Sequence, residues 1–79
     1  MLSSTAAAPL TPREQEIALL VMHGLSNKQI AHKLDLRECR VKLHVRNIMQ
    51  KFEVSNRTQI ALRYYEIDRK RAVEPPPRD

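Results

Sequence analysis

The pattern that most constrains the fold is a helix-start signal that occurs three times in the central part of this 79-residue chain. Each signal pairs a Ser, Thr or Asn with a Glu or Gln three residues later, and the pairs are Thr11 with Glu14, Ser26 with Gln29, and Asn56 with Gln59. In such a capping box the first side chain accepts a bond from the helix backbone, and the second reaches back to the first residue. The sequence therefore predicts helices that begin directly after these three caps.

The ends of the predicted helices are also marked. Gly24, the only glycine in the chain, is the residue type that most often stops a helix in the left-handed conformation. The second helix is expected to end near Leu34, the third near residues 54–56 and the fourth near Arg69. No segment alternates between apolar and polar residues as a half-buried strand would. The prediction is an all-α fold of four helices.

The composition divides the chain into three parts. Residues 1–9 are mostly small and polar and predict a linker or flexible N-terminal arm. Residues 71–79 contain three prolines, which cannot continue a helix and favour a disordered, extended tail. The folded part is therefore expected at residues 10–70, which is enough for one small domain.

Apolar residues recur at helical spacing and predict the hydrophobic core. The chain has no Trp, one Phe and two Tyr, so the core must come mainly from aliphatic side chains. The residues of the first three helices that are expected to face inward are Ile17, Ala18, Leu20, Val21, Ile30, Ala31, Leu34, Val41, Val45, Ile48 and Phe52.

The segment 37–52 predicts a helix with two contrasting faces. One apolar stripe is formed by Val41, Val45, Ile48 and Phe52. The other positions carry mainly Arg, Lys, Asn and Gln, with Glu38 as the one acidic residue. Ordinary surface helices mix both signs of charge, whereas cationic and amide groups suit the major groove of DNA. Together with the short helix before it, this segment forms a candidate helix-turn-helix unit.

The charge of the whole chain indicates an anionic partner. Lys and Arg number 14 and Asp and Glu number 9, a net charge of +5, which favours nucleic acid first and an acidic protein or membrane surface second. No apolar run approaches the roughly 18 residues that span a membrane, and the start MLSSTAAAP lacks the basic flank of a secretory signal. A single Cys excludes an internal disulfide and fits a cytoplasmic protein.

Four motifs together resemble one known family. They are L-T-x-R-E-x-E-I, G-L-S-N-K-x-I-A, V-K-x-H-V-x-x-I-x-x-K and N-R-T-Q. Residues 10–62 are similar to the LuxR-type helix-turn-helix domain, which is the DNA-binding module of NarL/FixJ response regulators, of quorum-sensing regulators and of small stand-alone regulators. The resemblance implies four helices, with the second and third forming the unit that binds double-stranded DNA, and no cofactor.

The resemblance also implies which side chains contact DNA. Base edges would be contacted by Lys42, Leu43 and Arg46, and the i, i+4 spacing of the two cations agrees with a shared face. Lys and Arg suit guanine, and a Leu suits the methyl group of thymine. Phosphate contacts would come from the start of the second helix and from the flanks of the third, namely from Asn27, Lys28, Arg40, Asn47 and Lys51. Arg37, which departs from the family pattern, is expected to add a further phosphate contact.

The fourth helix carries two apolar stripes, and a short terminal helix cannot bury both. One stripe consists of Ile60, Tyr64 and Ile67, and the other of Thr58, Ala61, Leu62 and Tyr65. The second stripe is either a partly exposed surface, which is common, or, as the resemblance implies, the contact between two copies across a two-fold axis. A small contact of this kind would give a homodimer that forms only on DNA.

Three positions depart from the family pattern. Arg37 stands where Ser or Thr usually caps the third helix, and Arg cannot accept a backbone hydrogen bond. Arg40 replaces the usual Thr, and Glu53 replaces a Gly, so Glu53 must adopt the backbone turn that Gly allows. Region 4 of bacterial sigma factors shares part of the pattern, but the LuxR type is favoured by His44, Ile48 and Lys51.

The remaining reactive residues form no metal-binding or catalytic pattern. His44 is expected at the edge of the core, with one ring nitrogen bonded to the backbone. His23, His32 and Cys39 lack the spacing of a zinc site, and Cys39 has no partner for a redox function. An enzyme is not expected, because the sequence contains no paired carboxylates, no nucleophile with a base and no Gly-rich phosphate loop.

Two functions remain open at this point. The first is a sequence-specific regulator of transcription that binds two-fold sites in double-stranded DNA as a dimer. The second, suggested by Arg37 and Arg40, is an adaptor of the same fold that binds RNA polymerase or another acidic partner. Because no receiver-like acidic cluster is present, the chain is expected to be either the C-terminal effector domain of a response regulator or a stand-alone regulator.

Overall fold

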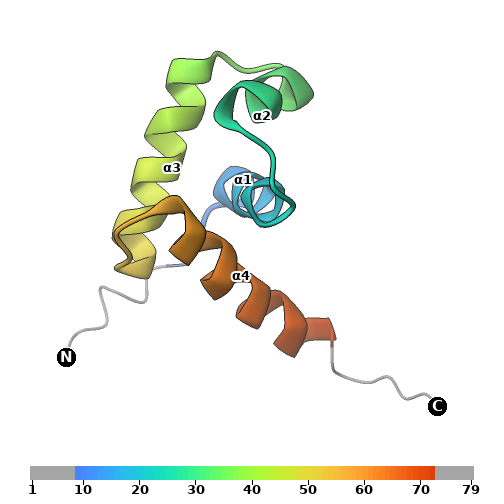
Figure 1. The fold of residues 1–79 in the computed structure, drawn as a ribbon, viewed down its shortest axis with the longest axis vertical. Helices are drawn as coiled ribbons and strands as arrows, with labels where there is room; N and C mark the ends of the chain where they lie inside the picture. The colour runs from blue at the N-terminus through green and yellow to red at the C-terminus, as the bar shows by residue number, and fades with distance from the viewer. Residues whose placement is uncertain (1–8, 73–79) are drawn as a thin grey trace.

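The computed structural model describes residues 9–72, with side chains up to Lys70, as four helices (Figure 1). They are α1 (Pro12–Met22), α2 (Asn27–Leu34), α3 (Glu38–Phe52) and α4 (Arg57–Ala72). No strand occurs in this range, and the predicted all-α fold is confirmed. The backbone of α4 continues past the predicted end at Arg69 to Ala72. The predicted N-terminal arm and Pro-rich tail lie almost entirely outside the described residues.

Two of the predicted helix starts are complete capping boxes. At α1, the Glu14 N–H donates to Thr11 Oγ1 at 3.1 Å, and the Thr11 N–H donates to Glu14 Oε1 at 2.9 Å. At α2, the Gln29 N–H donates to Ser26 Oγ at 3.1 Å, and the Ser26 N–H donates to Gln29 Oε1 at 2.8 Å. Each box satisfies backbone groups that a first turn otherwise leaves unpaired.

The start of α4 differs from its prediction in one bond. Asn56 Oδ1 accepts the Gln59 N–H at 2.9 Å, as expected of the cap. The Gln59 side chain, however, accepts the N–H of Ser55 at 2.7 Å instead of the N–H of Asn56. The third predicted capping box is therefore incomplete, because the side chain of Gln59 bonds to the residue before the cap. At α3, Arg37 is the N-cap and makes no side-chain capping bond, as predicted.

The backbone passes through the left-handed region after each of the first three helices. Gly24, after α1, has φ +89°, a conformation that its missing Cβ allows. Asp35 and Glu53, after α2 and α3, have φ 57° and 58°. Asp tolerates this conformation better than most residues. Glu53 adopts it at a position where Gly would be unstrained, as its place in the family pattern predicted.

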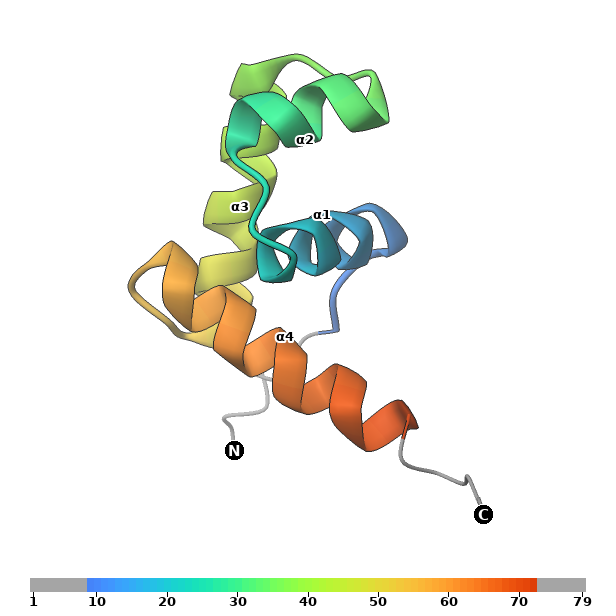
Figure 2. The same cartoon turned by 45° about the vertical axis from the view of Figure 1, so that its right-hand side comes forward.

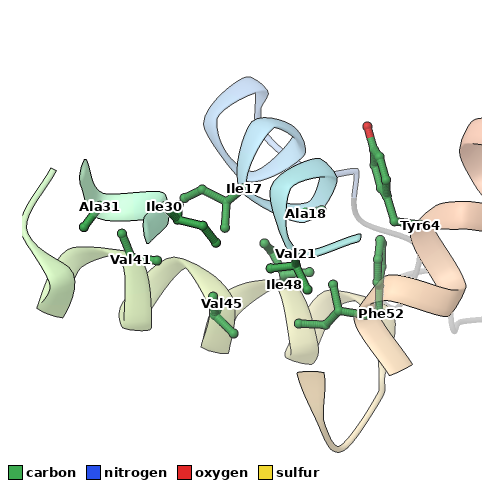
Figure 3. Close-up of a cluster of buried hydrophobic side chains, with 11 residues drawn as sticks. Ile17, Ala18, Val21, Ile30, Ala31, Val41, Val45, Ile48, Phe52 and Tyr64 are labelled. Atoms are coloured by element: carbon green, nitrogen blue, oxygen red, sulfur yellow. The ribbon is translucent and has the colours of Figure 1, made fainter. Parts of the chain in front are cut away.

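The hydrophobic core lies where the inward faces of the four helices meet (Figure 3). α1 packs against each of the other three helices, whereas α2 and α4 have no Cα atoms within 8 Å of one another. The buried apolar residues are Ile17, Ala18, Val21, Ile30, Ala31, Val41, Val45, Ile48, Phe52, Ile60 and Tyr64. The core therefore holds α3 against both α1 and α2.

The predicted core differs from the observed core only at its margins. All four predicted α3 residues are buried. Leu20 and Leu34 pack against the core but are only half-buried. Ile67 is 37% exposed. The C-terminal end of α4 extends beyond the other helices (Figure 2). The inward stripe of α4 therefore reaches the core only through Ile60 and Tyr64.

Candidate nucleic-acid interface

The outer face of α3 carries the three residues that were predicted to contact bases. Lys42, Leu43 and Arg46 are all exposed, and Leu43 leaves 46% of its surface accessible. The neighbouring Val41 and Val45 are buried. Because an α-helix has 3.6 residues per turn, burial of the apolar stripe turns the three side chains away from the core. The structure brings them together on one exposed face.

The first turn of α3 adds two more cations. Arg37 has an extended backbone, with φ −80° and ψ 147°, and its side chain takes no part in capping. Arg40 is also exposed, and Asn47 is half-buried on the flank of the helix. Glu38 lies in the same first turn, where the helix dipole favours a negative charge. Two predicted phosphate-contacting residues, Arg40 and Asn47, thus lie on this part of α3, and Arg37 stands at its N-cap.

The start of α2 holds two further predicted phosphate contacts. Lys28 is exposed, and Asn27 is half-buried. The Oδ1 atom of Asn27 accepts a bond from Nη1 of Arg57 at 2.5 Å, and Nη2 of Arg57 donates to the carbonyl oxygen of Leu25 at 2.6 Å. Burial lowers the pKa of the Arg57 guanidinium. The sequence analysis missed Arg57, although it stands in the N-R-T-Q motif.

Lys51, another predicted phosphate contact, makes bonds within the protein. Its Nζ donates to Glu14 Oε1 at 2.7 Å and to the carbonyl oxygen of Pro9 at 3.3 Å. The side chain of Glu14 is only 6% exposed and that of Lys51 27%. The ammonium compensates a buried carboxylate at the start of α1, which favours a structural role for Lys51 over a phosphate contact. The periodicity of α3 could not predict the contact with Glu14, because it does not show which residues of other helices lie beside Lys51.

The histidines and the cysteine differ in their exposure. His44 is half-buried at the edge of the core, as predicted, but the expected backbone bond is not made by its Nδ1 atom, which is buried and unpaired among residues 9–70. His23, His32 and Cys39 are exposed. In the described part of the chain, no three His, Cys, Asp or Glu residues gather as metal ligands.

The second apolar stripe of α4 faces outward. Leu62 and Tyr65 are 61% and 53% exposed. Thr58 is also exposed, and Ala61 is half-buried. The four residues share a face that core packing leaves largely unused. None of the helices in the described range combines the length and the apolar character needed to cross a membrane.

Comparison with known proteins shows the family to which the sequence is similar. The profile of the family described as "Bacterial regulatory proteins, luxR family" matches residues 8–64. The HTH-type transcriptional regulator MalT of Vibrio cholerae is 44% identical over 66% of the chain. The nitrate/nitrite response regulator protein NarL of Escherichia coli is 43% identical over 67%. The monoamine regulon transcriptional regulator of Klebsiella aerogenes is 50% identical over 71%.

The matched segment is a small part of each relative. It covers 6% of MalT, 24% of NarL and 25% of the monoamine regulon regulator. All three are named as regulators, which does not favour the adaptor or the sigma-factor alternative. The family profile covers well over half of the chain, including α1, α2, α3 and the first half of α4. The chain belongs to the LuxR family of bacterial regulatory proteins.

Proposed function

We propose that the chain is the DNA-binding part of a transcription regulator and that α3 lies in the major groove of double-stranded DNA. The observation that carries this proposal is the exposure of Lys42, Leu43 and Arg46 on the face of α3 that core packing leaves free. The major groove is about 12 Å wide and admits an α-helix. The relatives that are named as transcriptional regulators support the proposal.

The three side chains of this face have complementary partners in DNA. Lys42 and Arg46 lie one helical turn apart, and both suit the O6 and N7 acceptors of guanine. Leu43 lies between them in sequence and offers only apolar surface, which suits the methyl group of thymine. An exposed Leu on a cationic face has no role in the core, and contact with a base would remove its surface from water.

The remaining polar residues surround this face. Arg37, Arg40 and Asn47 on α3, together with Asn27 and Lys28 on α2, are proposed to contact phosphates. Such contacts fix the register of the protein on the duplex without reading its sequence. Each cation that neutralises a phosphate releases a counterion, so the affinity is expected to fall as the salt concentration rises.

The outward face of α4 is proposed to form a two-fold dimer. In a symmetric dimer the same residues of both copies meet, here Thr58, Ala61, Leu62 and Tyr65. Helix-turn-helix dimers bind half-sites about 34 Å apart, one turn of DNA, or a multiple of this distance, and a two-fold site would require this separation of the two α3 helices. Because the face is small, the dimer is expected to assemble on DNA. The regulator is proposed to act in the cytoplasm, either alone or as the C-terminal effector domain of a response regulator.

Selection of bound duplexes from a random DNA pool tests the proposed function. We expect the recovered sequences to contain two similar half-sites in inverted orientation, and their affinity to fall as salt increases. Recovery of no enriched motif, or binding that salt does not weaken, would contradict the proposal.

A further inference from the structure

We infer that Arg57 is a positioning residue for contact with the DNA backbone. Its guanidinium holds the side-chain amide of Asn27 so that the amide N–H groups face a phosphate at the start of α2. This inference rests on the proposed function, because it explains how one of the proposed phosphate contacts is oriented. Arg57 itself does not contact the phosphate.

Both terminal nitrogens of the Arg57 guanidinium are occupied within the protein. Nη1 donates to Oδ1 of Asn27 at 2.5 Å, and Nη2 donates to the carbonyl oxygen of Leu25 at 2.6 Å. Both acceptors belong to the segment that leads into α2. Two bonds from one rigid planar group fix the orientation of this segment as well as its distance from α4.

The chemistry of the donor decides which way the Asn27 amide points. A guanidinium carries only hydrogen-bond donors, so it must meet the amide oxygen, and the Nδ2 group must point away from Arg57. Within residues 9–70, Nδ2 is bonded to no acceptor and is not buried. An Asn27 side chain without this restraint would also turn its oxygen outward, and that oxygen would repel a phosphate.

The outward amide lies beside other groups that suit an anion. Ser26 Oγ accepts the Gln29 N–H, which leaves the backbone N–H groups of Asn27 and Lys28 without partners inside the helix. The exposed Lys28 adds a charge at the same turn. A helix start with free N–H groups favours phosphate, and the restrained amide supplies a side-chain donor to it.

Arg57 also bridges two helices, α2 and α4, whose Cα atoms do not come within 8 Å of one another in the described structure. Arg57 begins α4, and the adjacent Thr58 belongs to the proposed dimer face. The same residue therefore ties the phosphate-contacting end of α2 to the helix that is proposed to pair with a second copy.

Methylphosphonate scanning of a selected duplex tests the inference with the full chain. Replacing one phosphate at a time by a neutral methylphosphonate identifies the phosphate that Asn27 contacts. Wild type is expected to lose affinity when that phosphate is replaced. Asn27→Ala and Arg57→Lys should bind the unmodified duplex about 5- to 10-fold more weakly than wild type. The same replacement should not weaken their binding any further. Arg63→Lys is the matched control, because Arg63 is also on α4 but bonds to the Phe52 carbonyl, and it should retain the wild-type profile.

The salt dependence separates positioning from direct contact. Arg57→Gln should leave the slope of log affinity against log salt unchanged, because the lost charge does not neutralise a phosphate. A slope reduced by about 0.9 would show that Arg57 contacts a phosphate itself. That result would overturn the inference, and so would an Arg57→Lys variant with the wild-type methylphosphonate profile.

A measurement on the wild type covers the case in which a variant does not fold. The Nδ2–H resonances of Asn27 in an NMR spectrum should shift when the unmodified duplex is added, and should not shift with the duplex neutralised at the identified phosphate. Equal shifts with both duplexes would contradict the inference while leaving DNA binding intact. If wild type binds no duplex, the proposed function and this inference fail together.

Discussion

At the scale of single residues, Glu14 shows how this small domain accommodates a buried charge. Burial is the largest single influence on the pKa of its carboxyl, and it raises this pKa. The hydrogen bonds from Lys51 and from the Thr11 N–H, together with the charge of Lys51, lower the pKa by more than burial raises it. One oxygen, Oε1, serves both the capping box and the ion pair. The sequence predicted the capping role, while the burial results from the packing of α3 against α1.

The stability of the protein is expected to depend on pH through Glu14. Its pKa is lower in the folded protein than the ordinary value of 4.5, so it contributes stability above that value and loses it as the pH falls through the folded pKa. Glu14→Gln should lower the free energy of unfolding at neutral pH by about 2 kcal/mol. Urea titrations should show that the free energy of unfolding of wild type approaches that of the variant as the pH falls through the acid range. A constant difference between them at every pH would contradict this assignment.

Two lysine variants separate the structural role of Lys51 from DNA contact. Lys51→Met should lower the free energy of unfolding by about 2 kcal/mol, because it leaves the Glu14 carboxylate uncompensated, and should leave the salt dependence of DNA binding unchanged. Lys28→Met removes the same charge from an exposed position. It should leave the stability unchanged and reduce the salt slope by about 0.9. Equal changes of slope for the two variants would restore Lys51 to the interface.

At the scale of helices, the elements were predictable because their signals are local. A capping box acts over three residues, and Gly24 acts on the helix directly before it. The exposure of Lys42, Leu43 and Arg46 followed from the apolar stripe on the same helix. These features require no knowledge of where the other helices lie.

The contacts that the sequence did not reveal join residues far apart in the chain. Arg57 meets Asn27 across 30 residues, and Lys51 meets Glu14 across 37. Both contacts depend on how the helices cross, and no local pattern specifies the crossing. The unpaired Nδ1 of His44 was missed for the same reason, since its burial depends on packing that the periodicity of α3 does not describe.

The end of α3 offers a test of backbone strain. Glu53 has φ 58°, and a residue with a Cβ pays about 1–2 kcal/mol in this conformation. Glu53→Gly should therefore stabilise the domain by about 0.5–1 kcal/mol after the greater flexibility of Gly in the unfolded chain is allowed for. Asp35→Gly is the matched variant and should gain less, because Asp tolerates the left-handed region better. Thermal unfolding measures both, and a destabilised Glu53→Gly variant would contradict the strain argument.

At the scale of the whole molecule, the core orients two exposed faces of different chemistry. α1 packs against both α3 and α4, so it fixes the direction of the cationic face on α3 relative to the apolar face on α4. Figure 1 shows α3 along one edge, and Figures 1 and 2 show α4 extending away from its C-terminal end. Two copies that meet through α4 would hold their α3 helices at a fixed distance and orientation, as a two-fold DNA site requires.

A charge on the α4 face tests the proposed dimer. Leu62 is 61% exposed, so Leu62→Glu should leave the stability of the monomer unchanged. It should weaken binding to a duplex with two half-sites by at least about fivefold, because it introduces like charges into the contact between copies. Binding to a single half-site should not change. Ile67→Glu makes the same change on the other stripe of α4 and should not weaken binding to the duplex with two half-sites. Equal effects of the two variants would argue against this interface.

The central claim is that Lys42, Leu43 and Arg46 project from α3 and read base pairs. Base-by-base affinity measurements on a selected site, with wild type and Arg46→Ala, test it most directly. The variant is predicted to lose about 1–3 kcal/mol of discrimination at one base pair of each half-site, while the preferences at the other positions remain. A variant that keeps every wild-type preference, or loses affinity equally for all sequences, would contradict the claim.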